Sequence, residues 1–138
     1  MSEQTPQLGN SDYHVALLNR IRALCLSYPG TSERMSHGAP SFFIDGKKSF
    51  AQHRDNHHGD GKIALWCAAA PGVQAMLVES NPELYFVPAY VGHLGWVGMR
   101  LDRNAEWQEI EGVLGDAYLA RAPKKYITAI RQAAGTDQ

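Results

Sequence analysis

The sequence predicts an α+β fold in a single domain, in which helices pack on one side of a curved antiparallel sheet. Three observations carry this prediction. Short segments with strand patterns cluster between residues 33 and 101. Segments with apolar residues at helical spacing flank or interrupt them. Turn residues separate neighbouring strands, which favours antiparallel hairpins over parallel strand–helix–strand units.

Length and composition limit the alternatives. A chain of 138 residues fits one domain with one core. Its 44% hydrophobic and 20% charged residues argue against native disorder. The net charge of -1 supplies no global field that would attract a polyanion or an anionic membrane. Any binding to nucleic acid must therefore come from a local cluster of cations.

The cysteines and the termini indicate the compartment. Cys25 and Cys67 both lie in apolar surroundings, which is typical of reduced, buried thiols in a cytosolic protein. The chain has no apolar run of membrane-spanning length, and its first ten residues lack the pattern of a signal peptide. We expect a cytoplasmic protein without membrane contact. Residues 1–10 and 135–138 are expected to be flexible, and residues 11–134 to form the domain.

The first predicted helix begins after Ser11 or Asp12, either of which can cap it. Pro29 and Gly30 end it. Its apolar stripe, which we expect to pack on the sheet, consists of Val15, Leu18, Ile21 and Cys25.

Four candidate strands follow, at residues 33–37, 41–44, 48–54 and 62–68. Asp45 and Gly46 are turn residues between the second and the third, so we expect an antiparallel meander. Trp66 has alanines beside it on one face of its strand, with apolar residues on the other. This pattern predicts a central, buried strand.

The second half of the chain alternates helices and strands. Pro71 suits the first turn of a short helix that Asn81 and Pro82 stop. Short strands are predicted at 84–87 and 95–101. Asn104 can cap a helix, and Pro123 begins the last one. On the helix after Asn104, the residues expected in the core are Trp107, Ile110, Leu114 and Tyr118.

Several motifs together resemble a known family. They are SHGAPSFFIDGKKSFA, KIALWC, FVPAYVGHLGWVGMRLD and APKKY, in this order. The chain resembles the MmcQ/YjbR family of small bacterial proteins over residues 12–130. The resemblance implies the fold described as a double wing, and a proposed role in DNA binding.

Cations suited to phosphate contacts occur in two sets. The first lies in or beside two predicted hairpins and comprises Lys47, Lys48, Arg54 and Lys62. The second surrounds the third long helix and comprises Arg100, Arg103, Arg121, Lys124 and Lys125. The alternative is that these side chains are solvent-exposed surface residues without a binding role, as most lysines and arginines are.

The aromatic and glycine-rich stretch 88–102 is a candidate ligand surface. Its residues suited to ligand contact are Tyr90, His93, Trp96 and Arg100. His93 could exchange protons and Arg100 could hold an anion, but no nucleophile or paired carboxylate stands beside them in the sequence. In the alternative, Trp96 covers a neighbouring element and the nearby glycines permit turns and close packing.

The loop around residues 53–60 contains three histidines and two aspartates. His53, His57, His58, Asp55 and Asp60 are reasonable ligand types for a transition metal. The loop is glycine-rich and lacks a zinc-site spacing, so we expect no metal and no cofactor.

The sequence leaves three hypotheses open. The first is a non-enzymatic DNA-binding protein, and the second is a small-molecule binding domain or enzyme that uses the face from Tyr90 to Arg100. The third is a module that docks a partner protein or a second copy. The sequence specifies neither a substrate nor an oligomeric state.

Overall fold

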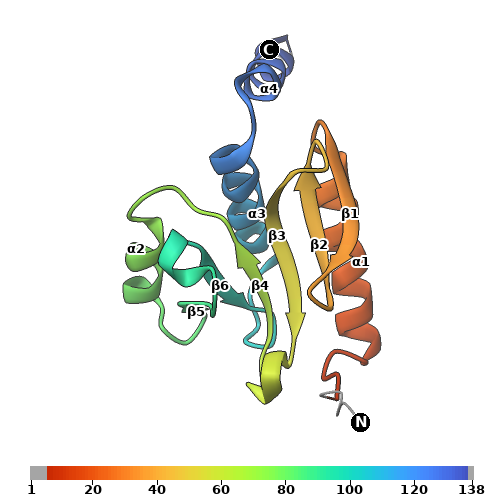
Figure 1. Ribbon diagram of the computed structural model, residues 1–138, viewed down its shortest axis with the longest axis vertical. Helices are drawn as coiled ribbons and strands as arrows, with labels where there is room; N and C mark the ends of the chain where they lie inside the picture. The colour runs from red at the N-terminus through yellow and green to blue at the C-terminus, as the bar shows by residue number, and fades with distance from the viewer. Residues whose placement is uncertain (1–5, 137–138) are drawn as a thin grey trace.

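The computed structural model describes residues 6–136, so the predictions for residues 1–5 and 137–138 lie outside the described part (Figure 1). The helices are α1 (Asp12–Ser27), α2 (Val73–Ser80), α3 (Trp107–Arg121) and α4 (Lys124–Thr136), with short 3-10 turns η1 (His57–Gly59) and η2 (Gly92–Leu94). The strands are β1 (Thr31–Ser36), β2 (Ala39–Ile44), β3 (Lys48–Asp55), β4 (Ile63–Cys67), β5 (Tyr85–Phe86) and β6 (Val97–Arg100). The predicted α+β class is confirmed.

The six strands form one antiparallel sheet in the order β1-β2-β3-β4-β6-β5. The meander predicted for the first four strands is therefore correct. β6 pairs with β4, with Cys67 opposite Val97, and the two-residue strand β5 closes the edge. A register shift between Phe42 and Phe43 bends the β2–β3 pair, which the alternation of residue types did not predict.

Two of the hairpin turns depend on left-handed backbone conformations. His37 and Gly38 have φ angles of 51° and 78° between β1 and β2. Asp45 and Gly46 have φ angles of 54° and 67° between β2 and β3. Turns of this hand match the twist of antiparallel strands, which explains why glycine follows a residue that tolerates positive φ at both places.

Helices α1 and α3 cover one face of the sheet (Figure 1). Ser11 caps α1 as predicted, since its Oγ accepts from the backbone N–H of His14 at 3.2 Å. Ile21, Cys25, Leu65 and Met99 are all fully buried in the core between these helices and the sheet. We call this side of the sheet the helix face and the other side the open face.

Helix α3 begins later than the sequence predicted. Its N-cap is Glu106, not Asn104, and Asn104 instead adopts a φ of 58° in the preceding loop. Asparagine is suited to both roles, so residue type alone did not decide between a cap and a left-handed turn. The predicted core residues Ile110, Leu114 and Tyr118 are buried as expected.

The chain before α1 contacts the sheet. The backbone N–H groups of Leu8 and Gly9 donate to the Asp55 carboxylate at 2.7 and 2.8 Å, and the Asn56 side chain donates to the Pro6 carbonyl at 2.8 Å. Residues 6–9 thus lie against the end of β3. None of the helices between residues 6 and 136 has both the length and the apolar character needed to cross a bilayer.

Candidate functional site

The open face of the sheet carries the candidate site. Gln52 of β3 lies opposite Trp66 of β4, and Arg54 lies two residues further along the same face. His53, between them, points to the helix face and pairs with Leu65. The alternation of β3 therefore separates one histidine from the cluster of polar and aromatic groups on the open face.

A cavity of about 460 Å³ lies on this face. Its floor is formed by strands β3 and β4, and its rim by the β1–β2 turn, η1 and the loop before η2. The lining residues are His37, Gln52, Arg54, His57, His58, Trp66, Tyr90 and Val91. We call this cavity the Arg54 pocket. Its volume lies in the range typical of small-ligand sites.

Arg54 is the charged group of the pocket, and it is 8% exposed. Its Nε and Nη2 donate to Gln52 Oε1 at 3.1 and 2.8 Å, and its Nη1 donates to the His37 carbonyl at 3.1 Å. The guanidinium also stacks on the Trp66 ring, 4.5 Å from its centroid. Burial lowers the pKa of Arg54 from its usual value. The side chain is thus held in one orientation by neutral partners.

Aromatic rings make up much of the pocket wall. The His57 ring stands edge-on to Trp66 at 4.8 Å and to Tyr90 at 5.6 Å between centroids. The indole Nε1 of Trp66 and the Nε2 of His57 are buried and have no hydrogen-bond partner among the described residues. Burial lowers the pKa of His57, so its imidazole is neutral at neutral pH. Such orphaned polar atoms are rare in folded proteins and indicate a site that a ligand or water completes.

The three histidines considered as metal ligands do not converge. His57 and His58 line the Arg54 pocket, whereas His53 faces α1 across a separate cavity that it shares with His14, Arg22 and Asp55. Within residues 6–136, no three histidine, cysteine or acidic side chains are grouped as metal ligands require. Asp55 is instead bonded to the backbone of Leu8 and Gly9.

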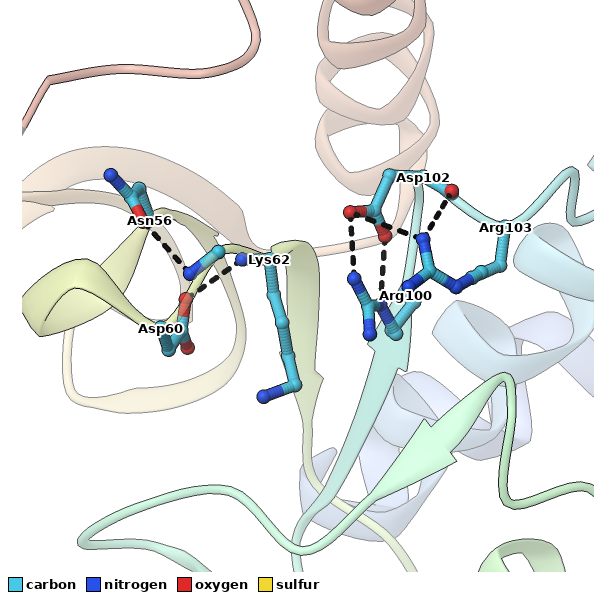
Figure 2. A network of polar contacts seen from close by, with 7 residues as sticks. Asn56, Asp60, Lys62, Arg100, Asp102 and Arg103 are labelled. Atoms are coloured by element: carbon cyan, nitrogen blue, oxygen red, sulfur yellow. Dashed lines mark hydrogen bonds and ion pairs between the residues drawn. The ribbon is translucent and has the colours of Figure 1, made fainter.

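Arg100 and Arg103, two of the candidate phosphate contacts, share one carboxylate. The Nε and Nη2 of Arg100 donate to Asp102 at 2.9 and 3.0 Å, and Arg103 Nη1 lies 3.9 Å from the same group (Figure 2). Lys62 stands just before the start of β4 (Figure 2). Its ammonium lies over the Phe86 ring, 5.1 Å from the ring centroid. Asp102 therefore offsets part of the charge at this end of the sheet.

The lysine candidates gather at the other end of β3. Lys47 and Lys48 are exposed at the β2–β3 turn, and Lys124 is exposed at the start of α4. Asp45 joins the two segments, since it accepts from Tyr126 Oη at 2.5 Å and lies 3.9 Å from Lys125 Nζ. We call Lys47, Lys48, Lys124 and Lys125 the lysine cluster. Arg100 pairs with Ala64, which pairs with Arg54, so Arg100 lies level with a residue that follows Lys48 by six positions. At about 3.3 Å per residue, the lysine cluster lies roughly 20 Å from Arg100 along the strand direction.

The candidate ligand surface from Tyr90 to Arg100 is divided by the fold. Tyr90 lines the Arg54 pocket and is 68% exposed. His93 is exposed on η2 and is not among the lining residues of that pocket. Trp96 is 5% exposed and belongs to the core, and Arg100 is paired with Asp102. The structure thus brings only Tyr90 of these four residues to the pocket.

Sequence reasoning did not select Gln52 or Trp66 as site residues. Trp66 was predicted to be buried in a central strand, and it is 1% exposed and part of the core. That its ring also lines the pocket was not predicted. The only available indication was polar Gln52 and Arg54 alternating with apolar residues in a strand that must be central. Their pairing with Trp66 depends on the register of β3 and β4.

The fold and the pocket define a class of protein: a single-domain α+β protein with two helices on one face of an antiparallel sheet and an aromatic pocket on the other. Residues 26–120 match the family model of YjbR, so the chain belongs to the YjbR family. The resemblance to MmcQ/YjbR proteins is confirmed.

The fold is also found in a solved structure. The crystal structure of Deinococcus radiodurans protein DR2400, which contains a DUF419 domain, is similar with a TM-score of 0.65 and 17% sequence identity. The similarity covers 86% of this chain and 87% of that one, and at this identity it supports the fold alone. No curated protein matches the chain.

Proposed function

We propose that this protein binds a small molecule in the Arg54 pocket. The observation that carries the proposal is the pair of buried, unpartnered nitrogens, Trp66 Nε1 and His57 Nε2, on the wall of a cavity of about 460 Å³. Leaving such groups without a partner costs about 1–3 kcal/mol each, and a bound ligand removes that cost. The proposal is of binding, because the described lining offers hydrogen-bond donors and aromatic rings and contains no serine, cysteine or carboxylate to act as a nucleophile.

The test follows the indole resonance of Trp66 in nitrogen–proton NMR spectra while a small-molecule library is added. A ligand in the pocket is expected to shift this resonance and to leave the Trp107 indole, which lies on α3, unchanged. Trp66→Phe assigns the resonance. A library of broad chemical composition that moves neither indole would contradict the proposal.

Replacing Tyr90 tests the pocket without disturbing the core. Tyr90 has a φ of 63°, so Tyr90→Asn removes the ring and keeps a residue that tolerates this backbone conformation. We expect ligand affinity to fall by roughly 5- to 10-fold, the equivalent of losing one aromatic contact. Tyr13→Ala removes another exposed tyrosine, one that does not line the pocket, and serves as the control. Equal affinity in the Tyr90 variant and the wild type would exclude contact with that ring.

DNA binding is the second candidate function, and the lysine cluster favours it. The contact of Asp45 with Tyr126 and Lys125 brings two basic segments together that lie far apart in the sequence. Four neighbouring ammonium groups are suited to phosphate contacts, which supply most non-specific affinity. Lysines are common on protein surfaces without any binding role. A charge-reversal experiment separates DNA contact from this ordinary surface role.

Lys47→Glu combined with Lys48→Glu is expected to weaken DNA binding by about 10-fold or more at low salt and to flatten its salt dependence. Fluorescence anisotropy with labelled duplex and single-stranded DNA measures both effects. The matched control is Lys62→Glu with Arg103→Glu, which makes the same charge change at the opposite end of the sheet. If the control pair weakens binding and the first pair does not, the lysine cluster is not the contact surface.

A cytoplasmic location forms part of the proposal. Cys25 and Cys67 are both buried and free. Burial raises the pKa of the Cys25 thiol to about 12, which keeps it protonated and unreactive. Thiols of this kind suit a reducing compartment.

A further inference from the structure

Arg54 is buried, and its partners differ from those of the half-buried Arg22 and Arg100. Arg121, which is half-buried, also has no ion pair among residues 6–136 and donates to the Ser49 carbonyl at 3.2 Å. Arg22 is paired with Glu33 at 2.6 Å, and Arg100 with Asp102 at 2.9 Å. Among residues 6–136, no carboxylate lies within ion-pair distance of Arg54, although it is 8% exposed. A buried cation without a counter-charge is unfavourable, and a bound anion would supply the missing charge.

The donors of the pocket are arranged for an acceptor. Gln52 Oε1 accepts from Nε and Nη2 of Arg54, and the His37 carbonyl accepts from Nη1. One N–H on each Nη nitrogen therefore has no partner among residues 6–136. Trp66 Nε1–H is a further unpaired donor on the same wall. A group that only accepts hydrogen bonds, with two or more oxygens, matches this set, and carboxylates and phosphates are such groups.

The remainder of the wall suits a flat ring. The His57 ring stands at 74° to Trp66 and at 87° to Tyr90, so it is nearly perpendicular to both of these rings. Aromatic side chains in this arrangement contact a flat group by its face and its edge at once. A cavity of about 460 Å³ has room for one ring together with an oxyanion.

We propose that the ligand of the Arg54 pocket is an oxyanion, a phosphate or a carboxylate, attached to a flat unsaturated ring. The oxyanion accepts from the free N–H groups of Arg54 and from Trp66 Nε1–H, and the ring lies against His57 and Tyr90. This inference rests on the proposed small-molecule function and names the chemical class of its ligand.

The experiment compares four probes by isothermal titration and by the Trp66 indole resonance. Phenyl phosphate and benzoate contain both parts, benzyl alcohol contains the ring without charge, and inorganic phosphate contains the oxyanion alone. We expect at least one of the first two to bind about 10-fold or more tightly than benzyl alcohol and inorganic phosphate. If phenyl phosphate and benzoate both bind no more tightly than benzyl alcohol, the oxyanion is overturned, but the pocket remains a binding site.

Arg54→Met is expected to weaken binding of the charged probes by roughly 10- to 100-fold and to leave benzyl alcohol unchanged. Arg54→Lys keeps the charge without the planar fork, and it replaces Arg54→Met if that variant does not fold. The matched control is Arg20→Met, because Arg20 also stacks on a tryptophan, Trp107, at 4.0 Å but lies on α1. Unchanged affinity in both Arg54 variants would reject the assignment.

The ring-bearing oxyanion has two possible sources, a free metabolite or the phosphorylated end of a nucleic-acid strand. Thymidine monophosphate and a short 5′-phosphorylated oligothymidylate distinguish them, with Arg54→Met as the control for each. Binding of the mononucleotide alone assigns a free ligand, and tighter binding of the strand assigns a nucleic-acid end. If no probe in either series shifts the Trp66 indole resonance, the inference about the ligand class is wrong. If the broad small-molecule library also leaves this resonance unshifted, the proposed small-molecule function is wrong as well.

Discussion

Gly98→Val is expected to lower the free energy of unfolding by about 1–3 kcal/mol. Gly98 lies in β6 opposite Phe86 of the edge strand β5, and the Phe86 ring packs directly over it. A Cβ atom at position 98 would lie within 2.4 Å of that ring, well inside van der Waals contact. Chemical denaturation of the variant measures the loss.

A double-mutant cycle with Phe86→Ala identifies the cause. If the collision with the ring is responsible, Phe86→Ala should cost less in the Gly98→Val background than in the wild type, by at least about 0.5 kcal/mol. The control is Gly112→Ala on α3, where an added Cβ meets no atom within 4 Å. That substitution should stabilise the protein by up to about 1 kcal/mol, since alanine is the better helix former. Simple additivity in the cycle would mean that Gly98 serves another purpose.

The result bears on the role of the glycines in the stretch 88–102. The sequence did not decide whether they allow a ligand to approach the backbone or allow close packing. For Gly98 the packing explanation has a named partner in Phe86. Similarly, a Cβ atom added at Gly92 would lie 2.6 Å from the Val87 side chain. Gly95, with a φ of 88°, permits the turn that ends η2.

Acid is expected to destabilise the protein through His53. This imidazole is 7% exposed on the helix face, and burial lowers its pKa to about 4, against a partly opposing effect of Asp55. The unfolded chain takes up a proton near pH 6.5, whereas the folded protein does not until about pH 4. The contribution of neutral His53 to the free energy of unfolding is therefore fully present above about pH 6.5 and is lost as the pH falls toward 4. The loss between pH 7.5 and 4.5 should be about 2–3 kcal/mol.

Denaturation curves of the wild type and of His53→Gln at both pH values test this expectation. The variant keeps a neutral polar side chain, so it should lose about 2–3 kcal/mol less than the wild type over the same interval. His14, Arg22 and Asp55 share the cavity with His53, and they remain in the variant as a common background. Parallel pH profiles for the two proteins would show that another group controls acid stability.

Much of the fold followed from local chemistry. Ser11, Asp45 and Gly46 are residues whose backbone and side-chain preferences specify a helix cap and a turn, so their structural roles were predictable. Alternation at Val97, Met99 and Leu101 predicted which side chains of β6 enter the core. Asn104 was predicted wrongly as a cap because its preferences fit two backbone states equally well.

The candidate site was only partly accessible in the sequence. Tyr90 and Arg54 were both identified as candidates, but for different surfaces and different ligands. Gln52 was not identified. Trp66 was correctly predicted as buried, but its place in the pocket depends on the neighbouring strand. Lys47 and Lys125 were placed in separate basic sets, and the contact of α4 with Asp45 joins them.

The sequence by itself determined the α+β class, the family, the order of the elements and the first hairpins, because these depend on periodicity, caps and turns within a few residues. Tertiary structure alone decided that Arg54 of β3 lies against Trp66 of β4, beside rings from η1 and from the loop before η2. That arrangement arises from strand register and from loop closure across more than thirty residues, roughly the separation of Arg54 from Tyr90. A shift of register by one residue would move every side chain of the strand to the other face, so the pocket forms only when the strands pair in this register.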